Sequence, residues 1–176
     1  MNLKKIIGIA LISVLAYIFM LFIKIPVSFL DFDIKDIIIA LGGLILGVSP
    51  CLIISFLVAF LELITVSSTG IVGFLMNFIS TIFYVVPIVL VYKRKKSKKN
   101  LLFGVLLGTI SMTLIMILFN ILITPIYLGV PLKEVLKLLL TLIIPFNIGK
   151  GILNGILYIL ISNPLEKALK KAKFFN

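Results

Sequence analysis

The chain has 176 residues, of which 62% are hydrophobic, and its mean hydropathy is +1.33. This excess is typical of a protein embedded in a bilayer, since a soluble domain is about half apolar. Histidine is absent, which excludes histidine-ligated metals and histidine acid–base chemistry, and the single cysteine cannot form an internal disulfide.

Apolar runs divide the chain into predicted helices. The first, at 6–23, is long enough to cross a bilayer and has no clear small-x-small cleavage site, so we interpret it as a retained span rather than a signal peptide. The second, at 37–48, has only 12 residues, which also fits a re-entrant or interfacial segment. Four longer runs follow, at 51–66, 71–92, 101–127 and 135–161.

Basic residues predict how these helices are oriented. Most of the 17 basic residues lie in three short clusters: Lys4 and Lys5, the run 93–99, and Lys167, Lys170, Lys171 and Lys173. The positive-inside rule places all three in the cytoplasm, and lipid therefore explains the net charge of +11 better than nucleic acid does. An even number of crossings must then separate each basic cluster from the next. Counting the short run at 37–48 as a span gives four crossings and then two. We expect one all-α membrane domain over residues 1–176, a compact bundle of six transmembrane helices in the cell membrane with cytoplasmic N- and C-termini.

Glycine pairs spaced four residues apart indicate close helix packing. They occur at Gly43 and Gly47, Gly104 and Gly108, and Gly151 and Gly155. Each pair would place two small residues on one helix face, where neighbouring backbones can approach. This pattern supports a compact bundle and carries no information about function.

The stretch "IIPFNIGKGILNG", at 143–155, places polar groups inside an apolar run. A lysine at the centre of a span costs about 2.5–3.5 kcal/mol on insertion scales, so Lys150 is expected either to bind a ligand or form an ion pair, or to reach an interface as a simple snorkelling lysine. Pro145 can break the helix and change the depth of this lysine. Asn147 shares a helix face with Lys150, and Asn120 lies in the preceding run. Each asparagine alone is explained by an interhelical hydrogen bond, whereas the three together favour a polar pocket.

Carboxylates are concentrated in the loop "SFLDFDIKD". Asp31, Asp33 and Asp36 alternate there with Phe29 and Phe32. Their spacing is not that of an EF-hand, so no metal site is predicted. We expect a solvated outer loop, which its aromatic residues make suitable as a lid over a pocket. A further acid, Glu62, is expected near the outer end of its helix, where a salt bridge with Lys150 is one possibility.

Several stretches resemble the riboflavin-binding S components of energy-coupling-factor (ECF) vitamin transporters. "IIPFNIGKG" is similar to the last-helix signature of that family, and "FNILITPIYLG" and "STGIVGFLMNF" resemble its fifth helix and its third-to-fourth junction. "FLDFDIKDIIIALGGLILG" is similar to its first outer loop and short second helix. Lys35 and Ile38 stand where the family commonly has serine and proline. The alanine pattern that docks the coupling subunit is partly present on the first helix, as Ala10, Ser13 and Ala16.

The resemblance implies a six-helix bundle that captures riboflavin from outside. Delivery would require a transmembrane coupling subunit and two cytoplasmic ATPase subunits, with riboflavin as the transported ligand and no cofactor. Carried over by matching motifs, Asn120, Asn147 and Lys150 are expected to hydrogen-bond the flavin. The loop from Asp33 to Ile39 is expected to cover its ring, and the candidate contacts there are Phe32, Asp33, Asp36, Ile38 and Ile39.

Other functions remain as alternatives. An S component for another vitamin fits the same architecture, and flavin mononucleotide (FMN) is a possible ligand because Lys150 or Lys35 could meet its phosphate. A membrane-embedded enzyme would need clustered acids, histidines or an activated nucleophile within the membrane, and a pore would need a polar stripe along a helix. The polar residues of this chain gather instead at one level, as expected for a binding site.

Overall fold

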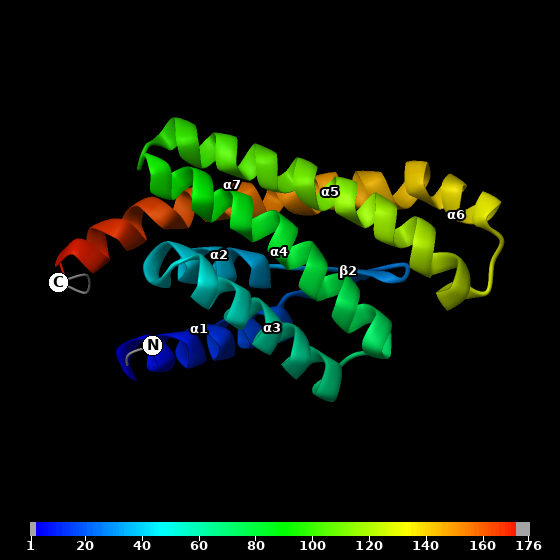
Figure 1. Cartoon of the computed structure of the whole chain (residues 1–176), viewed down its shortest axis with the longest axis horizontal. Helices are drawn as coiled ribbons and strands as arrows, with labels where there is room; N and C mark the ends of the chain where they lie inside the picture. The colour runs from blue at the N-terminus through cyan, green and yellow to red at the C-terminus, as the bar shows by residue number, and fades with distance from the viewer. Residues whose placement is uncertain (1–2, 172–176) are drawn as a thin grey trace.

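The computed structural model describes residues 3–171, which form a bundle of helices with one small hairpin (Figure 1). The elements, in chain order, are α1 (Leu3–Phe22), β1 (Lys24–Val27), β2 (Leu30–Asp33), α2 (Lys35–Leu46), α3 (Val48–Thr65), α4 (Gly70–Arg94), α5 (Lys98–Leu128), α6 (Leu132–Leu138), the π-helical segment η1 (Leu139–Ile143) and α7 (Ile144–Lys171). The all-helical expectation is therefore confirmed, apart from the hairpin.

Five helical segments in the described part of the chain are long and apolar enough to cross a membrane. They are α1, α3, α4, α5 and the continuous stretch Leu132–Ser162. At about 1.5 Å per residue, the 12 residues of α2 extend about 18 Å, which is shorter than a hydrocarbon core of about 30 Å. The structure therefore supports five spans by length, and a sixth crossing by α2 remains a prediction.

The short helix α2 lies at the centre of the bundle, where it contacts α1, α3, α4 and α7. Most of its residues are buried, including both charged residues of its first turn, Lys35 and Asp36. A short link joins α2 to α3 at Gly47, whose φ of 112° favours glycine. Gly47 is therefore part of a turn, and the expectation that it shares a helix face with Gly43 is wrong.

Close packing of α4, α5 and α7 follows the other two glycine pairs. A Cβ on Gly108 would lie 2.4 Å from the backbone oxygen of Tyr84 in α4, and one on Gly151 would lie 2.6 Å from Oγ1 of Thr109 in α5. The Tyr84 hydroxyl in turn donates a hydrogen bond to the Gly151 carbonyl (2.8 Å). These contacts confirm the close approach predicted for both pairs.

A two-stranded antiparallel hairpin replaces the loop expected between the first two helices. Lys24 pairs with Asp33 and Val27 pairs with Leu30 across β1 and β2, and Ser28 in the turn has a positive φ of 60°. Figure 1 shows the hairpin pointing toward the end of the bundle where α5 ends. The expectation of a solvated loop is wrong for Asp33, which is 1% exposed, and for Asp36 just beyond the hairpin, which is 0% exposed.

Pro145 does not break the last helix. Helix α6, segment η1 and α7 follow one another without a gap, and η1 contains Thr141, four residues before the proline. A proline ring clashes with the carbonyl at that position in an ordinary α-helix, and a π turn is a common way of relieving such a conflict. Asn147 and Lys150 therefore share one face of an intact helix, as predicted.

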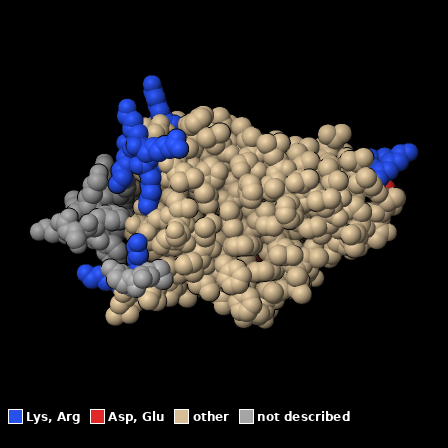
Figure 2. All heavy atoms as spheres, in the orientation of Figure 1, with Lys and Arg blue, Asp and Glu red and all other residues tan. Residues whose placement is uncertain are grey.

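The basic clusters lie at one end of the molecule. In Figure 1 the start of α1, the turn between α4 and α5 and the end of α7 are at the same end, and Figure 2 shows most of the visible Lys and Arg side chains there. An even number of membrane crossings between successive basic clusters requires this arrangement. Which side of a membrane this end faces remains a prediction, and Lys173 lies outside the described residues.

Candidate functional site

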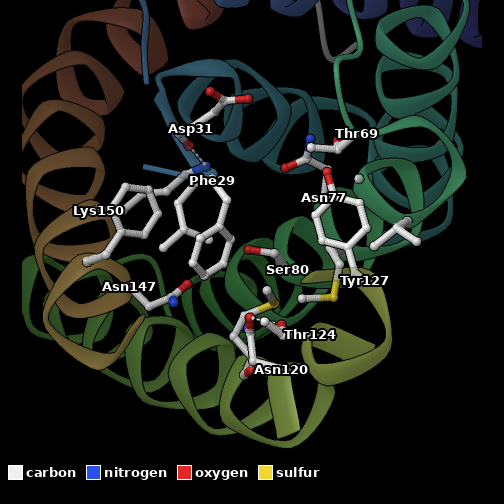
Figure 3. Close-up of a pocket in the computed structure, with 16 residues that line it drawn as sticks. Phe29, Asp31, Thr69, Asn77, Ser80, Asn120, Thr124, Tyr127, Asn147 and Lys150 are labelled. Atoms are coloured by element: carbon white, nitrogen blue, oxygen red, sulfur yellow. Dashed lines mark hydrogen bonds between the residues drawn. The ribbon is translucent and has the colours of Figure 1, made fainter. Parts of the chain in front are cut away.

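A pocket opens at the other end of the bundle, between the hairpin, α4, α5 and α7 (Figure 3). The hairpin contributes Phe29, Leu30 and Asp31. The start of α4 and the residue before it contribute Thr69, Val72, Gly73, Met76, Asn77 and Ser80, α5 contributes Met116, Asn120, Thr124 and Tyr127, and α7 contributes Phe146, Asn147 and Lys150. The pocket therefore combines three aromatic side chains with three side-chain amides, and it draws on segments that are far apart in the sequence.

The enclosed part of this pocket is narrow. About 670 Å³ lies between its side chains when the open mouth is included, but the cavity itself has a volume of only about 80 Å³. The smaller value measures enclosed space, and it is below the 300–1,000 Å³ or so that is typical of small-molecule sites. A ligand the size of a vitamin therefore requires side chains at the mouth to move. Phe29 in the hairpin turn and the 39% exposed Tyr127 are placed to do so.

Asn120 and Asn147 line the pocket from facing helices, as the sequence predicted. Each uses its amide nitrogen to donate a hydrogen bond to the carbonyl four residues earlier, Met116 for Asn120 and Ile143 for Asn147 (both 2.7 Å). These bonds fix the direction of each amide, because a carbonyl accepts only from the nitrogen. Asn120 also accepts a hydrogen bond from Thr124 (2.8 Å), whereas the oxygen of Asn147 accepts none from the described residues.

Lys150 lines the pocket wall but is held by the hairpin. Its ammonium lies 3.0 Å from Oδ2 of Asp33 and 3.4 Å from the backbone oxygen of Asp31, and it is 5% exposed. The interfacial, snorkelling alternative is therefore wrong, and the ion-pair alternative describes this structure. A direct contact between Lys150 and a ligand remains a prediction.

Asp33 is a shared partner of two lysines. Oδ2 of Asp33 also accepts from the Lys35 ammonium (2.7 Å), and Oδ1 accepts from the Lys35 backbone N–H (3.1 Å). Burial alone would raise the pKa of Asp33, but the charges of Lys150 and Lys35 outweigh burial and hold it well below its ordinary value. Asp33 thus lies behind Lys150 rather than on the pocket wall. Asp36 accepts a hydrogen bond from Thr81 (2.7 Å), and neither acid is among the residues that line the pocket.

Glu62 belongs to the same group of charges and is buried near the end of α3. Its carboxylate lies 3.0 Å from the Lys24 ammonium and 3.6 Å from that of Lys35, so it pairs with these lysines rather than with Lys150. It also accepts from the amide of Asn77 (2.9 Å), which lines the pocket. Lys24 lies 3.0 Å from Asp31 as well, so the hairpin is tied to α3 and the pocket wall together.

The remaining predicted contacts lie elsewhere. Phe32 and Ile38 line a separate apolar groove between α1, the hairpin and α7, and Ile39 is 0% exposed in the core. The part of the hairpin that reaches the pocket is its turn and the start of β2, with Phe29, Leu30 and Asp31, rather than the segment after Asp33. The segment after Asp33 leads into α2, whose residues are mostly buried within the bundle.

Two features of the site and its surroundings were not foreseen. Asn77 lines the pocket although it is not among the predicted contacts, and a paired hairpin stands where a loop was expected. The three residues of the expected docking pattern on α1 do not form one exposed surface. Ser13 and Ala16 are buried within the chain, while Ala10 is exposed. Among the described residues, no group of three or more acids, cysteines or histidines could hold a metal ion, and Asp31, Asp33 and Asp36 each face a lysine.

Comparisons with known proteins agree with this architecture. Residues 4–162 match the family model described as "ECF transporter, substrate-specific component". The chain is also similar to a solved structure of the S component of a bacterial ECF transporter, with 30% sequence identity, a TM-score of 0.77, and coverage of 95% of this chain and 98% of that chain. No match is found among curated proteins.

Proposed function

Because the chain belongs to the family of substrate-specific components of ECF transporters, we propose that the vitamin it captures is riboflavin. The family is a transporter component and not an enzyme, and it works with membrane and ATPase subunits. The pocket would receive the flavin from outside the cell and deliver it when the coupling and ATPase subunits act. Family membership does not specify the vitamin, so the identity of the substrate is the content of this proposal.

The observation that carries the proposal is the meeting of two sequence motifs at one pocket. Asn120, from "FNILITPIYLG", and Asn147 and Lys150, from "PFNIGK", resemble flavin-binding stretches of riboflavin S components, and all three line the same pocket. They are joined there by the turn of the hairpin, which is similar to the first outer loop of those proteins. Helix packing alone does not require these motifs to face a common space.

The chemistry of the pocket supports a flavin. An isoalloxazine ring is flat and largely apolar, with hydrogen-bonding groups at its edge, and the ribityl tail carries hydroxyls. Phe29, Tyr127 and Phe146 offer aromatic surface, and aromatic rings associate by offset stacking or edge-to-face contact. The amides of Asn77 and Asn147 can meet polar edges and hydroxyls.

Fluorescence titration of the purified chain tests the proposal. Riboflavin fluorescence should be quenched on binding, the preparation should be yellow if the vitamin co-purifies, and the other vitamins transported by this family should not compete. Binding of a different vitamin in place of riboflavin would show that the family assignment holds but the substrate is wrong.

A further inference from the structure

The charged groups beside the pocket form one continuous cluster. Three lysines, Lys24, Lys35 and Lys150, face four carboxylates, Asp31, Asp33, Asp36 and Glu62, through ion pairs of 2.7–3.9 Å. The cluster carries a net charge of −1 when all of these groups are ionised, and zero when one carboxyl holds a proton. Oδ2 of Asp36 is buried without a hydrogen-bond partner, which makes this group suited to hold that proton. In neither state is the cluster positive.

Each lysine of the cluster is already committed to carboxylates. The Lys150 ammonium has Asp33 at 3.0 Å and Asp36 at 3.9 Å, with the Asp31 carbonyl as a third neighbour. Of the three donors of the ammonium, two are used by Asp33 and by the Asp31 carbonyl, while the Asp36 carboxylate at 3.9 Å adds an attraction between opposite charges without a hydrogen bond. Lys35 lies between Asp33 and Glu62 and is 1% exposed, which removes it from the pocket surface.

The pocket wall offers no further cation. Asp31 and Lys150 are the charged side chains among the described residues that line it, and the rest of the lining is uncharged. The lysines of α6, Lys133 and Lys137, are exposed and do not line the pocket. A bound phosphate normally requires charge-assisted hydrogen bonds from arginine or lysine, which this wall could supply only by breaking a buried ion pair.

We propose that the pocket selects ligands that bring no negative charge, so that it binds riboflavin and discriminates against FMN and against vitamins that carry a carboxylate. This inference rests on the proposed function and names the specificity of the same site. FMN differs from riboflavin by a phosphate of charge about −1.5 to −2 at neutral pH. With all of its carboxylates ionised, the cluster adds one unit of like charge. At an effective dielectric constant of about 20 and a separation of about 10 Å, that charge weakens binding of a singly charged anion by about tenfold.

The test compares the dissociation constants of riboflavin and FMN for the wild-type protein by fluorescence quenching at neutral pH. We expect FMN to bind at least about tenfold more weakly. Equal or tighter binding of FMN would overturn the inference while leaving the riboflavin proposal intact. If neither flavin binds, the proposed function is wrong and this inference falls with it.

A charge-neutralising variant sharpens the comparison. Glu62→Gln removes one negative charge with little change of shape, and it should reduce the FMN-to-riboflavin ratio of dissociation constants several-fold. The matched control is Glu134→Gln, which makes the same charge change at an exposed residue of α6. A reduction in Glu62→Gln no larger than in this control would contradict the inference. A thermal melt identifies any variant that fails to fold, and the wild-type comparison is decisive without it.

Discussion

The Lys150 ammonium lies 3.0 Å from the Asp33 carboxylate, and this pair joins two positions separated by 117 residues. It connects α7 to the end of the hairpin, so the polar turn of the last helix and the hairpin beside the pocket are held in one arrangement. Both side chains are buried, at 5% and 1% relative exposure. Replacing either partner alone would leave the other as a buried charge with fewer partners.

The first prediction concerns that loss. Lys150→Met should destabilise the protein by about 3–5 kcal/mol, the usual cost of removing one partner from a buried ion pair. A thermal melt in detergent measures the effect, with Lys137→Met, at an exposed lysine of α6, as the control. An unchanged or higher melting temperature for Lys150→Met would show that removing a costly charge from the membrane outweighs the pairing.

The second prediction concerns pH. The folded-state pKa of Asp33 lies below its ordinary value of 3.8, because the charges of Lys150 and Lys35 outweigh the effect of burial. The ionised carboxylate therefore stabilises the fold fully above the unfolded-state pKa, and this contribution is lost as pH falls through the lower folded-state value. The melting temperature of the wild type should fall more steeply below about pH 5 than that of Asp33→Asn. Parallel curves would contradict this assignment.

The third prediction concerns topology. Cysteine introduced at Ser97, in the turn between α4 and α5, should be protected from impermeant reagents in intact cells, whereas cysteine at Ser68, between α3 and α4, should react. The native Cys51 is buried and gives little background. Labelling of Ser97→Cys from outside the cell would overturn the orientation predicted from the basic clusters.

The fourth prediction concerns energy coupling. The sequence has no phosphate-cradling glycine loop of the kind that binds ATP. In vesicles, the purified chain alone should bind flavin but should not accumulate it against a gradient, and accumulation should require coupling and ATPase subunits together with ATP. Concentrative uptake by the chain alone would be incompatible with the proposed mode of transport.

Hydropathy and motif spacing were sufficient to predict the helices and the core of the site. The runs of apolar residues are long enough to specify α1, α3, α4 and α5, and the spacing of Asn147 and Lys150 places both on one face of α7. Both residues lie in α7, which continues without a break past Pro145. Both asparagines and the lysine consequently line the predicted pocket.

The charged hairpin could not be predicted in the same way. A loop rich in aspartate reads as solvated, because its partners, Lys150 and Glu62, come from helices that the fold alone brings close. Asp33 is buried between Lys35 and Lys150, and Asp36 is buried beside Lys150 and Thr81. Such partners make the burial of a carboxylate possible. The faces of the hairpin depend on strand register, which a turn at Ser28 sets and which hydropathy does not reveal.

The central claim, that flavin binds between the hairpin, α4, α5 and α7, is tested most directly by riboflavin titration of Asn147→Leu. The oxygen of Asn147 is directed to the pocket, so a ligand group left without its partner should cost about 1–3 kcal/mol, or about five- to 150-fold in dissociation constant. Asn100→Leu, the same change in the first turn of α5 at the other end of the bundle, should bind riboflavin as the wild type does. Wild-type riboflavin affinity in a folded Asn147→Leu protein would contradict the account.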